Sequence, residues 1–422
     1  LAARAAAWRF CVDHEQPSSP AVLPAWARDT LHAHERDGRT HLPSWEQLAR
    51  AQTGDLAWDA LQRQLLVHGS LTDVLREAWL KALIPWSRTA TEAMHLAVEL
   101  LARLALDGDD VTTHHAIARA FGVDDTPHPL ETPHLGVLRP RRDITKLLDL
   151  SEFERRAHQP SRGAPLTVAI IGAGVAGAAA ARTLVDAGHV VTLFDRGRAP
   201  GGRLTTRVEG PLRFDLGAPY FTVRDERFAR WARAWWQERA LGQWRGVIEG
   251  EARTDSSDLV KLLGVPAMDF VVRRLLLGLE VRQGVDVKGL TRDGTRWRLL
   301  DAAGHPLGEY DVAVVATQPS QAAVLVDPSS YALASRIREV EVAPCWAVMA
   351  QFPERLEVTP DALVSHVGPL SLLVRNSSKP ERPVLAGDSW VLHASAEWSH
   401  AHLDDAPDDV AAMLLDALWA TT

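Results

Sequence analysis

The stretch that most constrains the fold runs from Val168 to Asp195 and reads VAIIGAGVAGAAAARTLVDAGHVVTLFD. Its apolar start, 168–171, predicts a buried parallel strand. A G-x-G-x-x-G turn follows, then an expected helix over 178–187 and a second strand over 189–194, with Asp195 at its end. This order of strand, glycine turn, helix, strand and acid indicates a dinucleotide-binding βαβ unit.

Each glycine of this turn has its own expected role. Gly172 permits the tight turn, Gly174 lets the backbone approach a pyrophosphate, and Gly177 lets the helix pack closely on the sheet. Ala176 lies beside them, where the helix N-terminal N–H groups point at the anion. Asp195, 23 residues after Gly172, stands where a ribose-binding carboxylate is expected.

Two further segments indicate which cofactor the domain binds. Residues 200–207 read PGGRLTTR and residues 214–221 read FDLGAPYF. The first resembles the extended motif of FAD-dependent amine oxidases, in which the arginine, here Arg203, lies along the FAD diphosphate and ribose. The second is similar to a renalase-like segment that passes close to the isoalloxazine, with Pro219 replacing the usual glutamine. The resemblance also implies a strand over 281–287 and a backbone contact from Val287 to the adenosine half of FAD. The cofactor-binding residues so predicted are Gly172, Gly174, Ala176, Gly177, Asp195, Arg196, Gly202, Arg203, Ala218, Tyr220 and Val287.

Residues 1–150 predict a different, all-α domain, because apolar residues recur at helical spacing and β-branched runs are almost missing. Helices are expected over 24–35, 45–51, 55–68, 71–86 and 91–106. The stretch 55–87, DLAWDALQRQLLVHGSLTDVLREAWLKALIPWS, resembles the C-terminal helical domain of class II DNA photolyases and cryptochromes, and the resemblance extends over about the first 142 residues.

In photolyases that domain holds FAD and docks a flipped pyrimidine dimer. This sequence departs from the pattern at Thr72, where His or Asn is usual, and at Asp109 and Thr112, where Arg and Asn are usual. We therefore expect a retained helical scaffold with eroded flavin chemistry, in which Trp58 and Trp79 serve helix packing. DNA is a possible partner only if this domain is active.

The second domain is expected over 166–422, after a linker over 151–165 that is charged and then rich in Pro, Ser and Gly. An amphipathic helix is expected over 227–244, and another helix starts within 264–268. From residue 342 the chain predicts strands of an antiparallel substrate sheet, including the stretch 389–403, followed by a last helix over 404–418. Relatives close the FAD site with a Gly-Asp pair that is not found after Trp390, and the serine-rich phosphate-cradling segment of photolyases would lie upstream of Leu1. Both ends are therefore expected to be shorter than in the relatives.

Composition argues against several classes of function. The formal net charge of −8 argues against a general nucleic-acid binder. Two cysteines, Cys11 and Cys345, provide neither a disulfide framework nor a zinc pattern, which fits a reducing cytoplasm. The histidines at 114, 115, 128 and 134 lack carboxylates or cysteines at ligand spacing, so no metal site is predicted. No apolar run is long enough to cross a bilayer.

The sequence thus predicts an α/β fold, with a Rossmann-like FAD-binding domain and an antiparallel substrate sheet, preceded by an all-α photolyase-like domain. The favoured function is an FAD-dependent oxidoreductase of the renalase-like, amine-oxidase type. It would pass hydride from an amine or dihydronicotinamide-like small molecule to flavin, with reoxidation by oxygen. Two alternatives stay open: a photolyase-like DNA-repair or light-sensing flavoprotein, and an inactive flavin-binding interaction protein.

Overall fold

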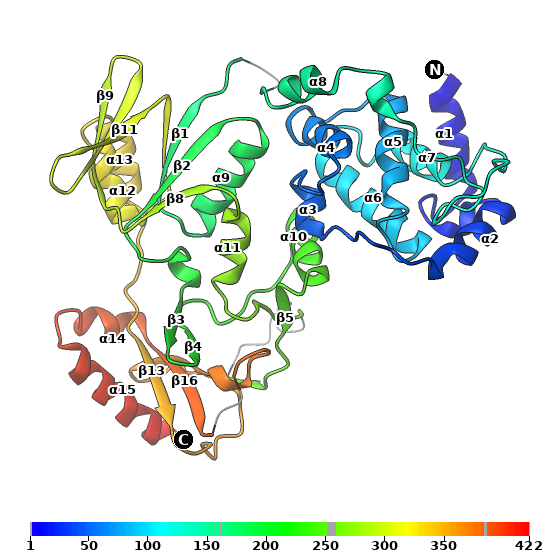
Figure 1. Ribbon diagram of the computed structural model, residues 1–422. Coiled ribbons are helices and arrows are strands. Elements are labelled where there is room, and N and C mark those ends of the chain that lie inside the picture. Colours follow the sequence, from blue (N-terminus) through cyan, green and yellow to red (C-terminus); the bar gives the residue numbers. More distant parts are fainter. Residues whose placement is uncertain (1, 161–162, 251–258, 384–385, 422) are drawn as a thin grey trace. The chain divides into compact units, whose positions relative to one another are not determined.

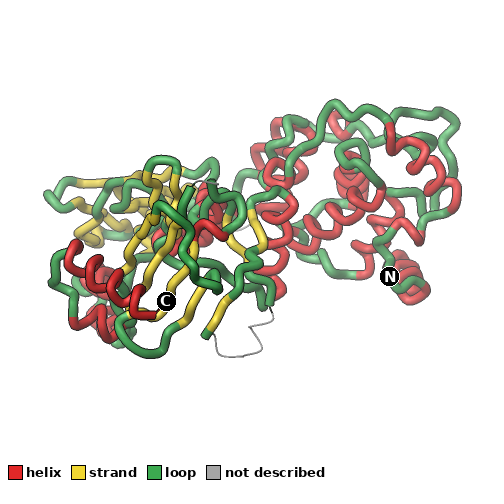
Figure 2. The backbone as a smooth tube through the Cα atoms, turned by 90° about the horizontal axis from the view of Figure 1, so that it is seen from below, coloured by secondary structure: helices red, strands yellow, loops and turns green. Residues whose placement is uncertain are grey.

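The computed structural model describes residues 2–160, 163–250, 259–383 and 386–421. The chain divides into two compact units (Figure 1). Unit 1 comprises Leu1–Pro165 with Asp186–Gly188, and unit 2 comprises Leu166–Val185 with His189–Thr422. Helices run throughout unit 1 and strands gather in unit 2 (Figure 2). The predicted fold class, an all-α region before an α/β region, is therefore confirmed.

Unit 1 is built of helices. They are α1 (Ala2–Asp13), α2 (Ala25–Ala33), α3 (Trp45–Ala49), α4 (Leu56–His68), α5 (Asp73–Leu83), α6 (Ala90–Leu104), α7 (Val111–Ala120) and α8 (Leu150–Ala157), with short 3-10 turns η1 (Pro20–Val22), η2 (His34–Arg36) and η3 (Ile144–Lys146). Local sequence explains their starts: Ser44 and Gln47 form a capping box on α3, and Asp55 caps α4. Trp58 and Trp79 are fully buried and stacked, with ring centroids 5.5 Å apart.

Several boundaries in unit 1 differ from the prediction, and two of them have a local cause. Helix α5 ends at Leu83 rather than at Trp86, because Pro85 has no N–H and disfavours the helical conformation of the residue before it. The expected linker over 151–165 begins with helix α8, which packs on α4 and has Asp149 as its N-cap. Its apolar contacts, such as the buried Ala157, are too few to produce a periodic pattern in the sequence.

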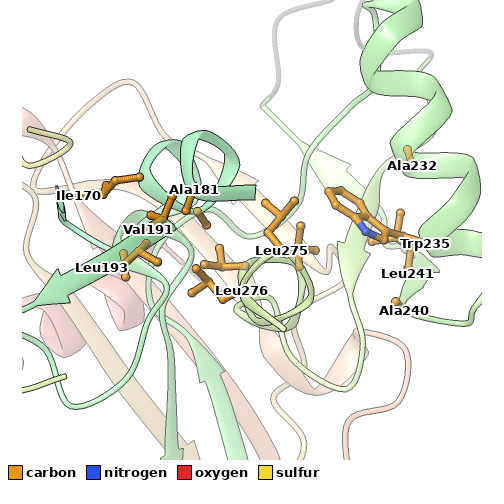
Figure 3. Close-up of a cluster of buried hydrophobic side chains, with 14 of the residues drawn as sticks. Ile170, Ala181, Val191, Leu193, Ala232, Trp235, Ala240, Leu241, Leu275 and Leu276 are labelled. Atoms are coloured by element: carbon orange, nitrogen blue, oxygen red, sulfur yellow. The ribbon is translucent and has the colours of Figure 1, made fainter. Parts of the chain in front are cut away.

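Unit 2 has a parallel sheet at its centre, in the order β12 (Val312–Val315), β1 (Thr167–Ile171), β2 (Val190–Asp195), β8 (Glu280–Gln283). One face of the sheet buries Val168 and Ile170 against α9 (Val175–Asp186) and α11 (Phe270–Leu276), and this core continues to Trp235 of α10 (Glu226–Gln237) (Figure 3). The other face buries Ala169 and Ile171 against an antiparallel sheet of β9 (Val287–Asp293), β10 (Arg296–Asp301) and β11 (Pro306–Tyr310). The alternation of side chains along β1 therefore supplies two separate cores.

A second, mostly antiparallel sheet follows in the chain. Its order is β13 (Ala347–Phe352), β16 (Asp388–Ala394), β15 (Leu370–Arg375), β14 (Ala362–Val364) and β6 (Ile248–Glu249), and β14 and β6 pair in parallel. Helix α15 (Pro407–Thr421) covers it with Val410, Leu414 and Leu418, which are fully buried at four-residue spacing.

The remaining elements are the hairpin β3 (Thr206–Glu209) and β4 (Leu212–Asp215), the pair β5 (Leu241–Gln243) and β7 (Leu262–Gly264), helices α12 (Pro319–Val326), α13 (Tyr331–Arg338) and α14 (Ala396–Ala401), and the turns η4 (Gly202–Leu204) and η5 (Asn376–Ser378).

Several predicted elements of unit 2 have different limits. Helix α10 ends at Gln237 rather than at 244, because Arg239 adopts a left-handed φ of 57° and the Ala240 N–H bonds back to the Trp235 carbonyl, as in a Schellman motif. Helix α11 starts at Phe270, since Gly264 still belongs to β7. The stretch expected as one strand over 389–403 is β16 and then helix α14, which Ser395 caps. The strand expected over 281–287 is β8, after which Val287 begins β9.

Candidate dinucleotide site

Each of the three glycines after β1 lacks a side chain for a different reason. A Cβ at Gly177 would lie 1.9 Å from the Gly172 carbonyl oxygen, so this glycine is required for α9 to pack on the sheet. Gly172 has a φ of 107°, which L side chains rarely adopt. A Cβ at Gly174 would meet nothing closer than the Cα of Gly202, at 3.8 Å, so protein packing does not require a glycine there. Gly174 instead leaves backbone open for the approach of a ligand.

Asp195 holds this glycine turn in shape. Its Oδ2 accepts a hydrogen bond of 2.6 Å from the Ala173 N–H, and its Oδ1 accepts one of 2.7 Å from the Gly197 N–H. The Gly172 N–H also donates to the Phe194 carbonyl at 2.7 Å. The ends of β1 and β2 are thereby fixed side by side, as the spacing predicted. The backbone bond of Ala173 was not predicted, because nothing in the sequence distinguishes this residue.

The second glycine pair packs directly on the first turn. Gly201 donates to the Ala173 carbonyl at 3.1 Å and pairs with Gly174 as an isolated bridge. Gly202, with a φ of 55°, would place a Cβ 3.1 Å from the Cα of Gly174. The two motifs, about 30 residues apart in the chain, thus form one cradle whose facing backbones carry no side chains.

Arg203 follows this cradle and points outward. Its side chain is exposed, and it has no hydrogen-bond or ion-pair partner among the described residues. Its carbonyl accepts the Ala218 N–H at 3.0 Å, which joins the Gly202 segment to the stretch after β4. Arg196 is also exposed, and Ala176 is exposed in the first turn of α9. Helix N-termini leave N–H groups without intrahelical acceptors, so this region offers donors and a cation to an anion.

Two predicted residues lie further from the cradle. Tyr220 belongs to a core with Trp244, whose ring centroid is 5.6 Å away, rather than to the glycine turns. Val287 is buried against Ile171 and Phe194 beneath the parallel sheet. The loop before Val287 contacts the site through backbone, because the Val285 N–H donates to the Asp195 carbonyl at 2.9 Å.

A buried charge cluster beside this region was not predicted. Asp215, the last residue of β4, accepts hydrogen bonds from Lys379 and Arg382, and all three side chains are at most 1% exposed. Burial raises the pKa of Asp215, but the attraction of the two cations outweighs it and holds the pKa below the usual value. Burial and the nearby Lys379 both hold the pKa of His393 below its ordinary value. The cations lie more than 160 residues from Asp215, so no local pattern could pair them.

The described residues include no group of three or more His, Cys, Asp or Glu side chains arranged to hold a metal ion. No described helix has both the length and the apolar character needed to cross a membrane.

Fold and cradle together define a nucleotide-binding Rossmann-like domain, and residues 170–235 match the family described as NAD(P)-binding Rossmann-like domain. Part of the chain is similar to the deoxyribodipyrimidine photo-lyase of Potorous tridactylus, with 41% identity over 85 residues, 20% of this chain and 16% of that protein. The phytoene desaturase (neurosporene-forming) of Rhodobacter capsulatus is 46% identical over 63 residues, 15% of this chain and 12% of that protein.

A third relative is the tRNA 5-methylaminomethyl-2-thiouridine biosynthesis bifunctional protein MnmC of Thiobacillus denitrificans. It is 32% identical over 212 residues, 39% of this chain and 34% of that protein. The chain therefore spans between 12% and 34% of the length of these three curated relatives. The predicted Rossmann-like domain and the photolyase resemblance are confirmed, whereas the renalase-like assignment stays a prediction.

Proposed function

We propose that the chain is an FAD-dependent oxidoreductase of the renalase-like, amine-oxidase type. The observation that carries this proposal is the cradle in which Gly174 faces Gly202, with Asp195 bonded to the first glycine turn. The exposed Arg203 directly follows the second glycine pair and has no side-chain partner among the described residues. A nicotinamide dehydrogenase has no need of the second glycine pair. The similarity to a phytoene desaturase and to the Rossmann-like family supports the same class of cofactor chemistry.

The residues present fit FAD. The N-terminus of α9 and the Arg203 guanidinium would hold the pyrophosphate, and the open backbone at Gly174 allows its close approach. Each Asp195 oxygen accepts one backbone N–H, which leaves acceptor capacity on both oxygens for the hydroxyls of the adenosine ribose.

When bound, the flavin would accept a hydride from an amine or dihydronicotinamide-like substrate, and oxygen would take up the two electrons. Such a transfer requires no side-chain nucleophile, so the chain would supply binding and orientation. We therefore propose a small-molecule substrate and assign no catalytic residue.

The test is the absorption spectrum of the purified chain between about 300 and 550 nm, where an oxidised flavin absorbs. It is recorded for the wild type and for Gly174→Glu and Asp195→Ala. Ala179→Glu is the matched control for the first variant, because Ala179 is exposed on α9, the helix that begins directly after Gly174. Asp301→Ala is the control for the second, because Asp301 also accepts two backbone N–H groups but lies at a turn of β10.

We expect flavin in the wild type and in both controls, and its loss in both site variants. A chain that takes up no flavin even with added FAD would refute the proposal. Flavin that is bound but not reduced anaerobically by amines or dihydronicotinamides would favour the inactive flavin-binding alternative.

A second candidate, a photolyase-like flavin site in unit 1, is favoured by the photo-lyase match and by one ion pair whose guanidinium is buried. Arg76, 6% exposed, donates two hydrogen bonds to Asp107 at 3.0 and 2.8 Å. Thr72 stands at the N-cap position of α5, and the Thr112 hydroxyl bonds to Asp110. Flavin that survives both Gly174→Glu and Asp195→Ala would support this candidate, and with it a DNA partner.

A further inference from the structure

Four groups from three other chain segments converge on the carboxylate of Asp215. Lys379 Nζ lies 2.8 Å and Arg382 Nη2 2.5 Å from its Oδ2. The Thr206 hydroxyl and the Met268 N–H donate to its Oδ1 at 2.7 and 3.1 Å. These groups come from β3, from the segment before α11 and from the loop between β15 and β16. A single buried carboxylate therefore fastens the end of β4 to three other parts of unit 2.

The loop between β15 and β16 also holds the backbone around Asp215. Asn376, 2% exposed, donates from its amide to the Arg213 carbonyl and accepts the Asp215 N–H at 3.4 Å. His393, 8% exposed, bonds through Nε2 to the Leu216 carbonyl at 2.8 Å. Because that carbonyl can only accept, Nε2 carries the proton. The path of the chain as it leaves β4 is thus fixed on both sides of Asp215.

This fixed exit leads directly to Arg203. The Ala218 N–H donates to the Arg203 carbonyl at 3.0 Å, and a Cβ at Gly217 would lie 1.9 Å from the same oxygen. Displacement of residues 216–218 would therefore displace the backbone of Arg203. The Arg203 side chain has no partner of its own among the described residues. The position of its backbone, which this contact fixes, therefore determines which positions its guanidinium can reach.

The charges of the cluster do not balance. Two cations, Lys379 and Arg382, share one carboxylate with no access to water, and the buried Nε of Arg382 has no hydrogen-bond partner in the part of the chain that the structure describes. Removing charges from water is costly, and a buried ion pair is weak evidence for a stabilising role. Such a cluster is better suited to fixing one conformation than to adding stability.

We propose that Asp215, Lys379 and Arg382 are positioning residues of the dinucleotide site, which act through residues 216–218 to hold Arg203 against the cofactor diphosphate. This inference rests on the proposed function, because it assigns Arg203 to the phosphates of FAD. It adds Lys379 and Arg382, from the loop between β15 and β16, to a site whose glycine turns, Asp195 and Arg203 all lie before residue 204.

The test is a double-mutant cycle on FAD affinity, measured by fluorescence titration of wild type, Lys379→Met, Arg203→Met and the double variant. Lys379→Met leaves a balanced Asp215–Arg382 pair, so the fold has the best prospect of surviving. We expect Lys379→Met to weaken FAD binding about tenfold in the wild-type background and less than about twofold in the Arg203→Met background, as for coupled residues. Equal weakening in both backgrounds, or none, would overturn the inference.

Two further variants separate positioning from general damage. Arg375→Met removes another buried cation of the same sheet, one that pairs with Asp388 and Asp361, and should leave FAD affinity unchanged even if stability falls. Gly217→Ala pushes directly on the Arg203 carbonyl without changing a charge and should weaken binding even if Lys379→Met does not fold. Unchanged affinity in Gly217→Ala would contradict the inference. A wild-type chain that binds no FAD would instead show that the proposed function itself is wrong.

Discussion

Two groups of paired charges, one in each unit, differ in their exposure to solvent. In unit 2 the side chains of Asp215, Lys379 and Arg382 are almost completely excluded from solvent. In unit 1 the Arg76 guanidinium is 7% exposed, but its partner Asp107 is 39% exposed. Water can replace a lost partner only where the remaining charge can reach it. The comparison therefore predicts that removing a single partner lowers the free energy of unfolding more in unit 2 than in unit 1.

The largest effect is expected from Asp215→Asn. This change leaves two cations buried without a counter-charge, so we expect the free energy of unfolding of unit 2 to fall by about 3–5 kcal/mol. Hydrogen exchange of β15 and β16, together with urea unfolding, measures the loss. Asp286→Asn is the control, because Asp286 is exposed beside Lys288 and its removal should change little. A loss no larger than that of the control would show that the buried cations are solvated in some other way.

An intermediate effect is expected from Arg76→Met in unit 1. The change removes two hydrogen bonds to Asp107 and one to the Thr113 hydroxyl at 3.0 Å, but Asp107 can be hydrated. We expect a loss of about 1–3 kcal/mol, as for buried hydrogen bonds to charged groups. Hydrogen exchange of α5 and α7 gives the measurement, with the exposed Arg4→Met as control. A loss that exceeds the one in Asp215→Asn would reverse the comparison.

The smallest effect is a pH dependence at His34, whose ring lies between two carboxylates. Its Nδ1 is 2.7 Å from Asp37 and its Nε2 is 2.8 Å from Glu131, and carboxylates only accept, so both nitrogens must donate. Hydrogen bonds to Asp37 and Glu131 raise the pKa of His34 above its ordinary value of 6.5, against a small opposing effect of burial. His134 also lies near Asp37, at 3.9 Å.

The direction of the pH dependence follows from the raised pKa of His34. The protonated ring stabilises the fold below pH 6.5, and this contribution disappears as the pH rises through the folded-state pKa of His34. We expect hydrogen exchange of residues 128–138 to accelerate over that range in the wild type and to show no such step in His34→Gln. Added salt should weaken the step, because Glu131 is 65% exposed. A step retained in His34→Gln would contradict the assignment of this pH dependence to His34.

Local sequence predicted the local parts of the structure. The glycine turn, its flanking strands and Asp195 were predicted because each needs a particular residue at a short spacing. The helix starts at Ser44 and Asp55 follow from their side-chain caps. The end of α10 could not be predicted in this way, because an arginine occupies a left-handed position where glycine would have given the signal.

Contacts between residues far apart in the chain could not be predicted for the site. Asp215 was noticed as part of FDLGAPYF, but its partners Lys379 and Arg382 lie more than 160 residues later, at the end of and just beyond a stretch that reads as a strand. Tyr220 was predicted from the same segment and lies in a core with Trp244. Only the folding of one sheet against another decides which charged side chains of a loop become buried.

The order of strands in the parallel sheet has a consequence for synthesis of the chain. Strand β1 occupies an inner position between β2 and β12, and Val168 pairs with Val312, 144 residues later. At translation rates of 5–20 residues per second, roughly 7 to 30 seconds separate the two strands at the ribosome. During that interval the apolar edge of β1 has no native neighbour on one side, and exposed edges of this kind promote association between chains. Nascent chains that stop before Val312 should therefore aggregate, whereas those that include Val315 can close the sheet.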